Sequence, residues 1–492
     1  MRNQKSDHGS DWRRTWFTVS LLLVLFVAGC APAIGDAGPT TSFAAQLANA
    51  DDPDLRAGQV ELRGDPGFDA GGLQGDAARF HSLLWESIDD PQQREYIERL
   101  ANSDNLYEYG RLVYTHSSAL LLAFRHTGDL RLLDRVDDLT EMMRSHLDDS
   151  WRDVREGSAE EGRDGYPNWV WRGRGSPDHQ GKDVHAIDEM RTHAFLAEVA
   201  WAFRNNEDLP SPKGIDYGER ADFWAEHLRE NFEAKWRERN EVRWPNFPFL
   251  QRPYMHPTLA MTKYHYYMYR LTGDIEYSLE ARRLSDVLFG EFQQVETPVG
   301  DAFVWTRSIS QWDGGEEYLT PTDYSSLVVA DALSLHLDGF YGWADLRVPH
   351  YLANMVSQFL IDAGSSSFAR DIGGGQRRAG IRPSSARDWT RVTRHGFAIN
   401  TWAFLTAYDE SGKIAQVAQD IWEDLPAQHR YPHIPAGLLT DAVAGDSLAA
   451  TWQELKASLP SRDGAQDEAG DGAQEDGQER EAQGQAAGAE AD

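Results

Sequence analysis

The chain has 492 residues, 41% of them hydrophobic, and carries a formal net charge of −31 at pH 7. This length and apolar content suffice for a packed core, and the acidic balance excludes duplex nucleic acid as a partner, because binding it requires broad cationic surface. Arginine far outnumbers lysine, and an acidic surface of this kind predicts a halophilic protein kept soluble in a salty medium by its own charge.

Residues 1–30 predict a lipoprotein signal peptide. Two arginines precede an apolar run from Phe17 to Ala28, which is too short to span a bilayer comfortably. The run ends in Val-Ala-Gly-Cys, which resembles a bacterial lipobox in which Cys30 is lipidated. Because Cys30 is the only cysteine, intramolecular disulfides are excluded. The expected localisation is export with lipid anchoring to the cell envelope, at the periplasmic face or the outer membrane; an uncleaved membrane anchor is the alternative.

Two further segments flank the region that is expected to fold. Residues 31–75 are rich in Gly, Ala, Asp and Pro and are expected to form a flexible tether. Residues 461–492 are rich in acidic residues, Gly, Ala and Gln, which predicts a disordered acidic tail. Residues 76–460 are therefore expected to hold the folded, catalytic domain.

Within residues 76–460, apolar side chains repeat at helical spacing, and no series of segments alternates as strands do. Turn residues separate the helices in pairs, at Gly128, Glu207, Gly273, Gly342 and Gly412. This spacing of about 70 residues exceeds that of common helical repeats. We therefore expect an all-α fold, an (α/α)6 or (α/α)7 toroid (an incomplete barrel) of helical hairpins, with an open solenoid as the alternative. A monomer is expected.

Polar residues recur at one place in these expected hairpins, before the turn. Four are histidines and the fifth unit carries a tyrosine near that place: His116, His193, His256, His395 and Tyr324. Where the same place in successive hairpins is polar, the side chains are expected to line one shared cavity. His116 lacks the neighbouring chemistry described below and is expected to be structural.

An arginine-rich segment leads into His395. Residues 370–395 concentrate arginine in a chain that is otherwise acidic, and a guanidinium can bind a carboxylate or sulfate bidentately. Arg391 and Arg394 closely precede His395 and are candidates for binding an anionic ligand. The alternative is a solvated loop whose arginines pair with the acidic surface.

Three loops that combine aromatic residues with arginine or histidine precede other expected inner helices. Their candidate residues are Asn168, Trp171 and His185 in the first loop, Arg252 and Tyr254 in the second, and Arg307 and Tyr318 in the third. Aromatic rings stack on sugar faces, so these loops suit the rim of a sugar-binding site. For each ring taken singly, a buried aromatic cluster is the alternative.

These residues resemble the helical-toroid polysaccharide lyases of the alginate and glucuronan lyase type. Such lyases use Asn and His to neutralise a uronate carboxylate, while a Tyr or His removes the C5 proton and a Tyr protonates the leaving oxygen. The chemistry needs donors that stabilise the developing dianion and a base within hydrogen-bond reach of C5. The chain lacks the adjacent Asn-His pair of several lyase families and an evident β-sandwich domain after the helices.

The resemblance implies a role for each candidate. The implied catalytic residues are Asn168 and His193 as carboxylate neutralisers, Tyr324 or Tyr318 as the acid/base, and His256 and His395. The implied substrate-binding residues are Arg394, Arg391, Arg252, Tyr254, His185, Trp171 and Arg307, with His185 a substitute neutraliser and Tyr254 a reserve acid/base. The implied function is β-elimination on a uronate-containing polysaccharide, with no cofactor and no metal. The expected partners are that acidic polysaccharide and the lipid bilayer.

Two other functions fit parts of the same pattern. A glycoside hydrolase on the same toroid requires paired carboxylates, and acids near the expected inner-helix starts are Asp188, Glu189, Glu316, Glu317 and Asp323. A non-catalytic exopolysaccharide-binding lipoprotein would need the cavity alone. A metal site at His185, Asp188, Glu189 and His193 is weakly indicated, because no HExxH string is present.

Overall fold

The computed structural model describes residues 59–148, 152–153, 162–163, 165–173, 180–181, 185–243, 254–310, 318–361, 368–369, 371–384 and 393–458. These residues belong to one compact unit, and they are mostly helical, which confirms the all-α prediction. In the described ranges the strands form two short antiparallel pairs, β1 (Arg152–Asp153) with β2 (Gly162–Arg163) and β3 (Gln293–Thr297) with β4 (Gly300–Val304). Cys30 and the expected signal peptide, the tether up to residue 58 and the acidic tail lie outside the described residues.

Six helical segments pack against one another in a succession that returns to its start. They are α5 (Tyr114–Thr127), α7 (Ala186–Arg204), α10 (Met255–Thr272), α13 (Thr322–Leu337), the 3-10 segment η9 (Thr401–Tyr408) and α17 (His433–Ser458). Each contacts the next in this order, and α17 contacts α5; α7 also packs on the π-helical turn η4 (Tyr109–Val113) that precedes α5. We call these six segments the inner segments.

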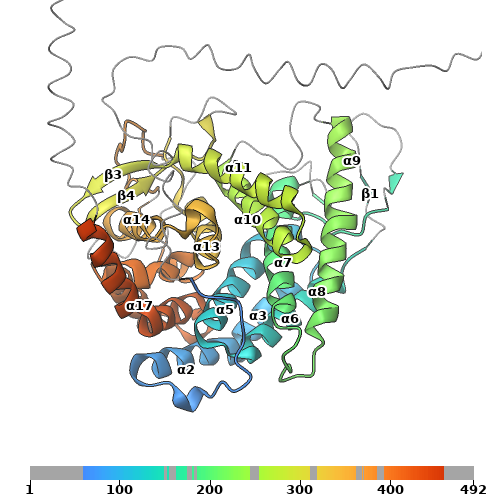
Figure 1. Ribbon diagram of the computed structural model, residues 1–492, viewed down its shortest axis with the longest axis horizontal. Coiled ribbons are helices and arrows are strands. Elements are labelled where there is room, and N and C mark those ends of the chain that lie inside the picture. The colour runs from blue at the N-terminus through green and yellow to red at the C-terminus, as the bar shows by residue number, and fades with distance from the viewer. Residues whose placement is uncertain are drawn as a thin grey trace, which may run out of the picture. The chain divides into compact units, whose positions relative to one another are not determined.

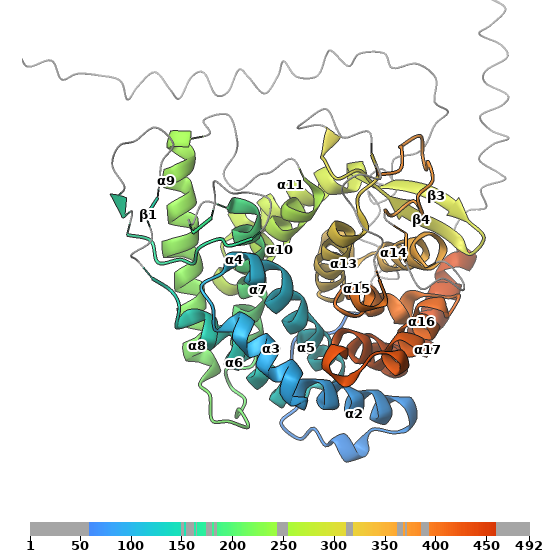
Figure 2. The same ribbon diagram turned by 180° about the vertical axis from the view of Figure 1, so that it is seen from behind.

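Each inner segment is accompanied by an outer partner. The partners are α6 (Leu130–Arg144) on α5, α8 (Tyr217–Glu226) on α7, α11 (Ile275–Glu291) on α10, α14 (Arg347–Met355) on α13, α16 (Lys413–Asp424) on η9 and α2 (Gly75–Asp89) on α17. Both views place α8 and α9 (Ala234–Arg243) at one side of this unit and α14 and α17 at the other, with α5, α10 and α13 between them (Figures 1 and 2). The remaining α-helices are α3 (Pro91–Ala101), α4 (Leu106–Glu108) and α15 (Arg394–Ala398). The remaining short helical segments are η3 (Ala70–Gly72), η6 (His227–Glu233), η7 (Tyr341–Ala344), η8 (Val356–Leu360) and η10 (Ala427–His429).

Turn chemistry in the sequence sets the ends of several hairpins. Gly128 and Gly273 adopt the left-handed conformation with φ of 70° and 71°, which closes α5 and α10. The aspartate after each glycine caps the next helix, because its side chain accepts a hydrogen bond from the second backbone N–H of that helix. The turn expected near Gly342 lies slightly earlier in the chain: α13 ends at Leu337, left-handed Gly339 makes the turn, and Gly342 lies within η7.

The backbones of α17 and η9 approach closely at Gly437, where a Cβ would collide with the carbonyl oxygen of Ala403. Gly437→Ala is expected to lower the free energy of unfolding by about 1–3 kcal/mol, the usual effect of overpacking a filled core. Gly445 lies on the same helix, but a Cβ there would meet only the movable carboxylate of Asp441. Gly445→Ala should therefore leave stability unchanged or raise it by up to about 1 kcal/mol. If chemical denaturation showed the same loss of unfolding free energy for Gly437→Ala and Gly445→Ala, the close approach of α17 and η9 at Gly437 would be contradicted.

Candidate functional site

Four of the expected site residues come together at the starts of α10 and α13. The ring of Tyr324, in the first turn of α13, lies 4.8 Å from the ring of His256, in the first turn of α10, measured between centroids. The guanidinium carbon of Arg307 lies 4.9 Å from the centroid of the Tyr324 ring and 4.6 Å from that of Tyr254. We call Tyr254, His256, Arg307 and Tyr324 the tyrosine-histidine cluster.

Backbone contacts hold this cluster together. The segment that follows β4 pairs with the residue before α10 through an antiparallel bridge between Tyr254 and Ser308. The N–H of Met255 donates to the carbonyl oxygen of Arg307 at 2.9 Å. Arg307 is therefore fixed beside the start of α10, although it is about 50 residues away along the chain, a separation that only tertiary pairing bridges.

Two arginines that the sequence interpretation missed adjoin the cluster. Arg111, in η4, has its guanidinium carbon 5.8 Å from the Tyr324 ring centroid, and its Nε donates to Asp188 Oδ1 at 3.3 Å. Arg191, in α7, is 1% exposed. The signal that was available is the place of Arg191 within a stretch that is expected to form an inner helix, since an arginine is seldom buried there without a specific reason.

These guanidinium groups act on His256, which is itself buried. Burial holds the pKa of His256 well below its usual value, and the nearby positive charges of Arg191, Arg111 and Arg307 lower it further. The imidazole is therefore neutral at physiological pH, and its surroundings oppose its protonation.

Asp188 connects Arg111 to two further expected residues. The indole N–H of Trp171 donates to Asp188 Oδ2 at 2.7 Å, and His185 Nδ1 lies 3.3 Å from the same oxygen. The rings of Trp171 and His185 stack with centroids 4.5 Å apart. Trp171 is 2% exposed, so this loop residue packs in the core and offers no open ring face in the described structure.

Asn168 and His193 belong to a different cluster, built around Glu189. Asn168 Nδ2 donates to Glu189 Oε1 at 3.0 Å, and the Nζ of buried Lys235 pairs with the same oxygen. His193 Nδ1 lies 2.8 Å from the Glu189 carbonyl oxygen, and its ring stacks on Phe232 at 4.0 Å. Burial lowers the pKa of His193 well below its usual value. These packed, paired side chains have the features of a structural cluster.

The residues expected from the arginine-rich segment lie at the start of α15. Arg394 forms an ion pair with Asp424 of α16. The ring of His395 lies 4.7 Å from that of His429, and burial together with His429 lowers the pKa of His395. The side chain of Tyr318 is 41% exposed, and its backbone pairs with that of Arg382 through a parallel bridge. The remaining candidates, Arg252 and Arg391, and the alternative acids Glu316 and Glu317 lie outside the described residues.

The other three candidate acids of the hydrolase alternative are paired with other side chains or have a raised pKa. Asp188 binds Arg111 and Trp171, and Glu189 binds Lys235 and Asn168. Burial raises the pKa of Asp323, next to Tyr324, although Arg111 and Arg307 act in the opposite direction.

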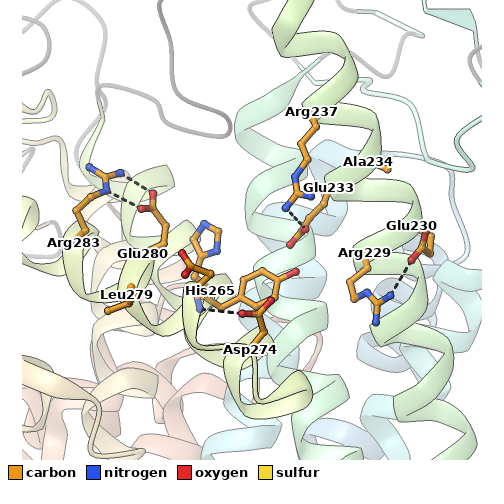
Figure 3. Close-up of a pocket in the computed structure, with 12 residues that line it drawn as sticks. Arg229, Glu230, Glu233, Ala234, Arg237, His265, Asp274, Leu279, Glu280 and Arg283 are labelled. Atoms are coloured by element: carbon orange, nitrogen blue, oxygen red, sulfur yellow. Dashed lines mark hydrogen bonds and ion pairs between the residues drawn. The ribbon is translucent and has the colours of Figure 1, made fainter. Parts of the chain in front are cut away.

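A cavity of 750 Å³ lies elsewhere, between η6 and α9 on one side and α11 on the other (Figure 3). Its lining arginines are paired with acids within the same wall: Arg229 with Glu230 at 3.0 Å, Arg237 with Glu233 at 3.0 Å and Arg283 with Glu280 at 2.7 Å. The cavity holds none of the expected site residues.

Among the described residues, no three His, Cys, Asp or Glu side chains are grouped so as to hold a metal ion. None of the described helices combines the length and apolarity that crossing a membrane requires. Comparison of the chain with protein-family models, with curated proteins and with solved structures gave no match.

Proposed function

We propose that this chain is a polysaccharide lyase that cleaves a uronate-containing polysaccharide by β-elimination. The observation that carries the proposal is the tyrosine-histidine cluster: the Tyr324 ring lies 4.8 Å from the His256 ring and 4.9 Å from the Arg307 guanidinium carbon. A neutral base, a phenol and several guanidinium groups are the groups that this elimination needs in one place.

The reaction assigns each group a task. The arginines stabilise the uronate carboxylate as the C5–H bond breaks and negative charge spreads onto its oxygens. His256 or Tyr324 accepts the C5 proton, a double bond forms between C4 and C5, and the C4–O4 bond breaks. The leaving O4 takes a proton from the phenol of Tyr324, which is then restored from solvent or from the base.

We propose that the inner segments form an (α/α)6 toroid. The return of their contacts from α17 to α5 and the outer partner on each inner segment support this arrangement. The site residues fit it, because Tyr254, His256 and Tyr324 lie at the starts of α10 and α13 and His185 lies at the start of α7. Lipid anchoring at Cys30 and an acidic polysaccharide partner remain parts of the proposal.

Incubating the purified protein with glucuronan, alginate, polygalacturonate and neutral cellulose tests the function. We expect ultraviolet absorbance of an unsaturated uronate to rise in step with new reducing ends, on at least one acidic polymer and not on cellulose. Reducing ends without that absorbance would favour a hydrolase. Binding without either signal would favour a polysaccharide-binding lipoprotein.

A further inference from the structure

Arg191 is a buried guanidinium that forms no ion pair within the described residues, although the charges of Asp188 and Asp331 act on it without direct contact. None of its three nitrogens has a hydrogen-bond partner in the described part of the chain, and all three are shielded from solvent. The nearest described aromatic face is the ring of Tyr114, with its centroid 5.0 Å from the guanidinium carbon. Arginine stays protonated in proteins, and a buried charge costs free energy unless it is paired. The burial of this positive charge therefore costs free energy that no ion pair offsets in the described residues.

The neighbouring buried cations differ from Arg191, because each is compensated. Lys263 Nζ lies 2.6 Å from Asp331 Oδ1 and 3.1 Å from Glu198 Oε2. Arg125 pairs with Asp338 and Glu198. Lys263 and Arg125 therefore each have an anionic partner in the described core, and Arg191 does not.

The charge of Arg191 acts on His256 in the tyrosine-histidine cluster. Burial lowers the pKa of His256, and the positive charges of Arg191, Arg111 and Arg307 lower it further. Arg307 has one buried nitrogen, Nε, without a hydrogen-bond partner in the described residues, and its charge also acts on Asp323. The groups that face His256 are Arg191 from α7, Arg111 from η4, Arg307 after β4, Tyr324 from α13 and Tyr254 before α10.

We propose that Arg191 is a fixed, buried positive charge that favours binding of a ligand carrying a carboxylate at the tyrosine-histidine cluster. Because its nitrogens are enclosed by protein atoms, Arg191 acts through its field and not by contact, so it is a positioning residue. The proposal rests on the proposed function only for the identity of the ligand, a sugar that carries a carboxylate. Its physical basis is a buried cation without an ion-pair partner in the described residues, and this does not depend on catalytic turnover.

Binding of tetrasaccharides by calorimetry tests the proposal. The probes are tetramers of glucuronate, mannuronate and galacturonate, with cellotetraose as the neutral counterpart, measured in a Tyr324→Phe background so that the probe is not consumed. At pH 8, Arg191→Met is expected to weaken binding of the preferred acidic tetramer about tenfold or more, because a positive charge is lost near a site of reduced dielectric constant. Affinity for cellotetraose should not change.

The pH dependence separates a charge effect from a structural one. Without Arg191, the repulsion that opposes protonation of His256 is reduced, so lowering the pH from 8 to 5 should return part of the lost affinity as the imidazole gains a positive charge. Arg191→Met combined with His256→Gln should show no such recovery, and the Tyr324→Phe background alone should show little pH dependence from this group. Arg191→Lys retains the charge and should stay within about threefold of the background.

Thermal unfolding supplies a control on folding. Removing an uncompensated cation should leave the melting temperature of Arg191→Met unchanged or higher, whereas removing the compensated cation in Lys263→Met should lower it. The proposal is overturned if Arg191→Met binds the acidic tetramer as tightly as the background, if Arg191→Lys loses as much affinity as Arg191→Met, or if no acidic tetramer binds. Arg191-dependent binding without cleavage of any polymer would instead refute only the lyase function.

Discussion

Replacing Tyr324 by phenylalanine is expected to lower kcat for uronate elimination by about a hundredfold to ten-thousandfold, the usual contribution of a positioned proton donor or acceptor. The phenol is the group that can protonate the leaving oxygen, and its ring is held between the Arg307 guanidinium and His256. Phenylalanine preserves the ring and its contacts with the arginines and removes only the hydroxyl. KM should change much less than kcat. Steady-state rates, measured with the polymer that the wild-type protein cleaves, will give both constants.

Tyr318→Phe is the matched control, because Tyr318 is the other tyrosine that the sequence offers as acid/base. Its side chain is 41% exposed, and its described pairing is a backbone bridge to Arg382. We expect Tyr318→Phe to retain kcat within about threefold, since no proton transfer is removed. Loss of activity in Tyr318→Phe with activity retained in Tyr324→Phe would reverse the assignment. Circular dichroism and unchanged melting temperatures should accompany both variants.

Local signals in the sequence predict the helices and several of their turns. Thr-Gly-Asp at residues 127–129 and 272–274 ends one helix at the glycine and caps the next at the aspartate, and both steps depend on neighbouring residues alone. The turn after α13 was expected near Gly342 and is made by Gly339, because both glycines offer the necessary backbone freedom. Tertiary packing of Trp343 into the core favours the earlier turn.

The same reasoning predicts only part of the candidate site. His193 and His256 occupy similar places in their hairpins, yet His193 packs on Phe232 while His256 faces Tyr324. A helix that is buried around its whole circumference gives no amphipathic signal to show which face a side chain takes. Arg191 was missed for a related reason, since arginine is ordinarily a surface residue and its burial follows from packing between α7 and its neighbours.

A buried network of charged residues lies beneath the candidate site and connects four inner segments. Lys263 of α10 pairs with Glu198 of α7 and with Asp331 of α13. Asp331 also accepts a hydrogen bond from the hydroxyl of Tyr114 in α5 at 2.7 Å. The Arg191 guanidinium lies over the Tyr114 ring. The network therefore holds in place the ring that Arg191 contacts. Loss of Lys263 would leave Glu198 with Arg125 alone and Asp331 without its ion-pair partner in the described residues.

Lys263→Met is accordingly expected to lower the free energy of unfolding by about 3–5 kcal/mol, because it leaves Glu198 and Asp331 buried without their shared cation. Methionine keeps most of the side-chain volume, so little of the loss arises from a cavity. Lys456→Met is the matched control: its ion pair with Glu410 has a similar length, 2.6 Å, but the lysine side chain is 35% exposed. That variant should lose at most about 1 kcal/mol. Urea denaturation at pH 7 measures the free energy of unfolding of both variants and of the wild type.

The pH dependence of this difference tests its cause. With Lys263 present, its charge and that of Arg125 outweigh burial and hold the pKa of Glu198 below its usual value. Without Lys263, burial is opposed less, and the pKa of at least one of the two carboxyl groups should rise above its value in the unfolded chain. A group of that kind is destabilising at neutral pH, and the destabilisation is relieved as the pH falls and the group takes a proton. The gap in unfolding free energy between wild type and Lys263→Met should therefore narrow between pH 7 and pH 5. A gap that stays constant over this range would mean that lost packing, and not unpaired charge, destabilises the variant.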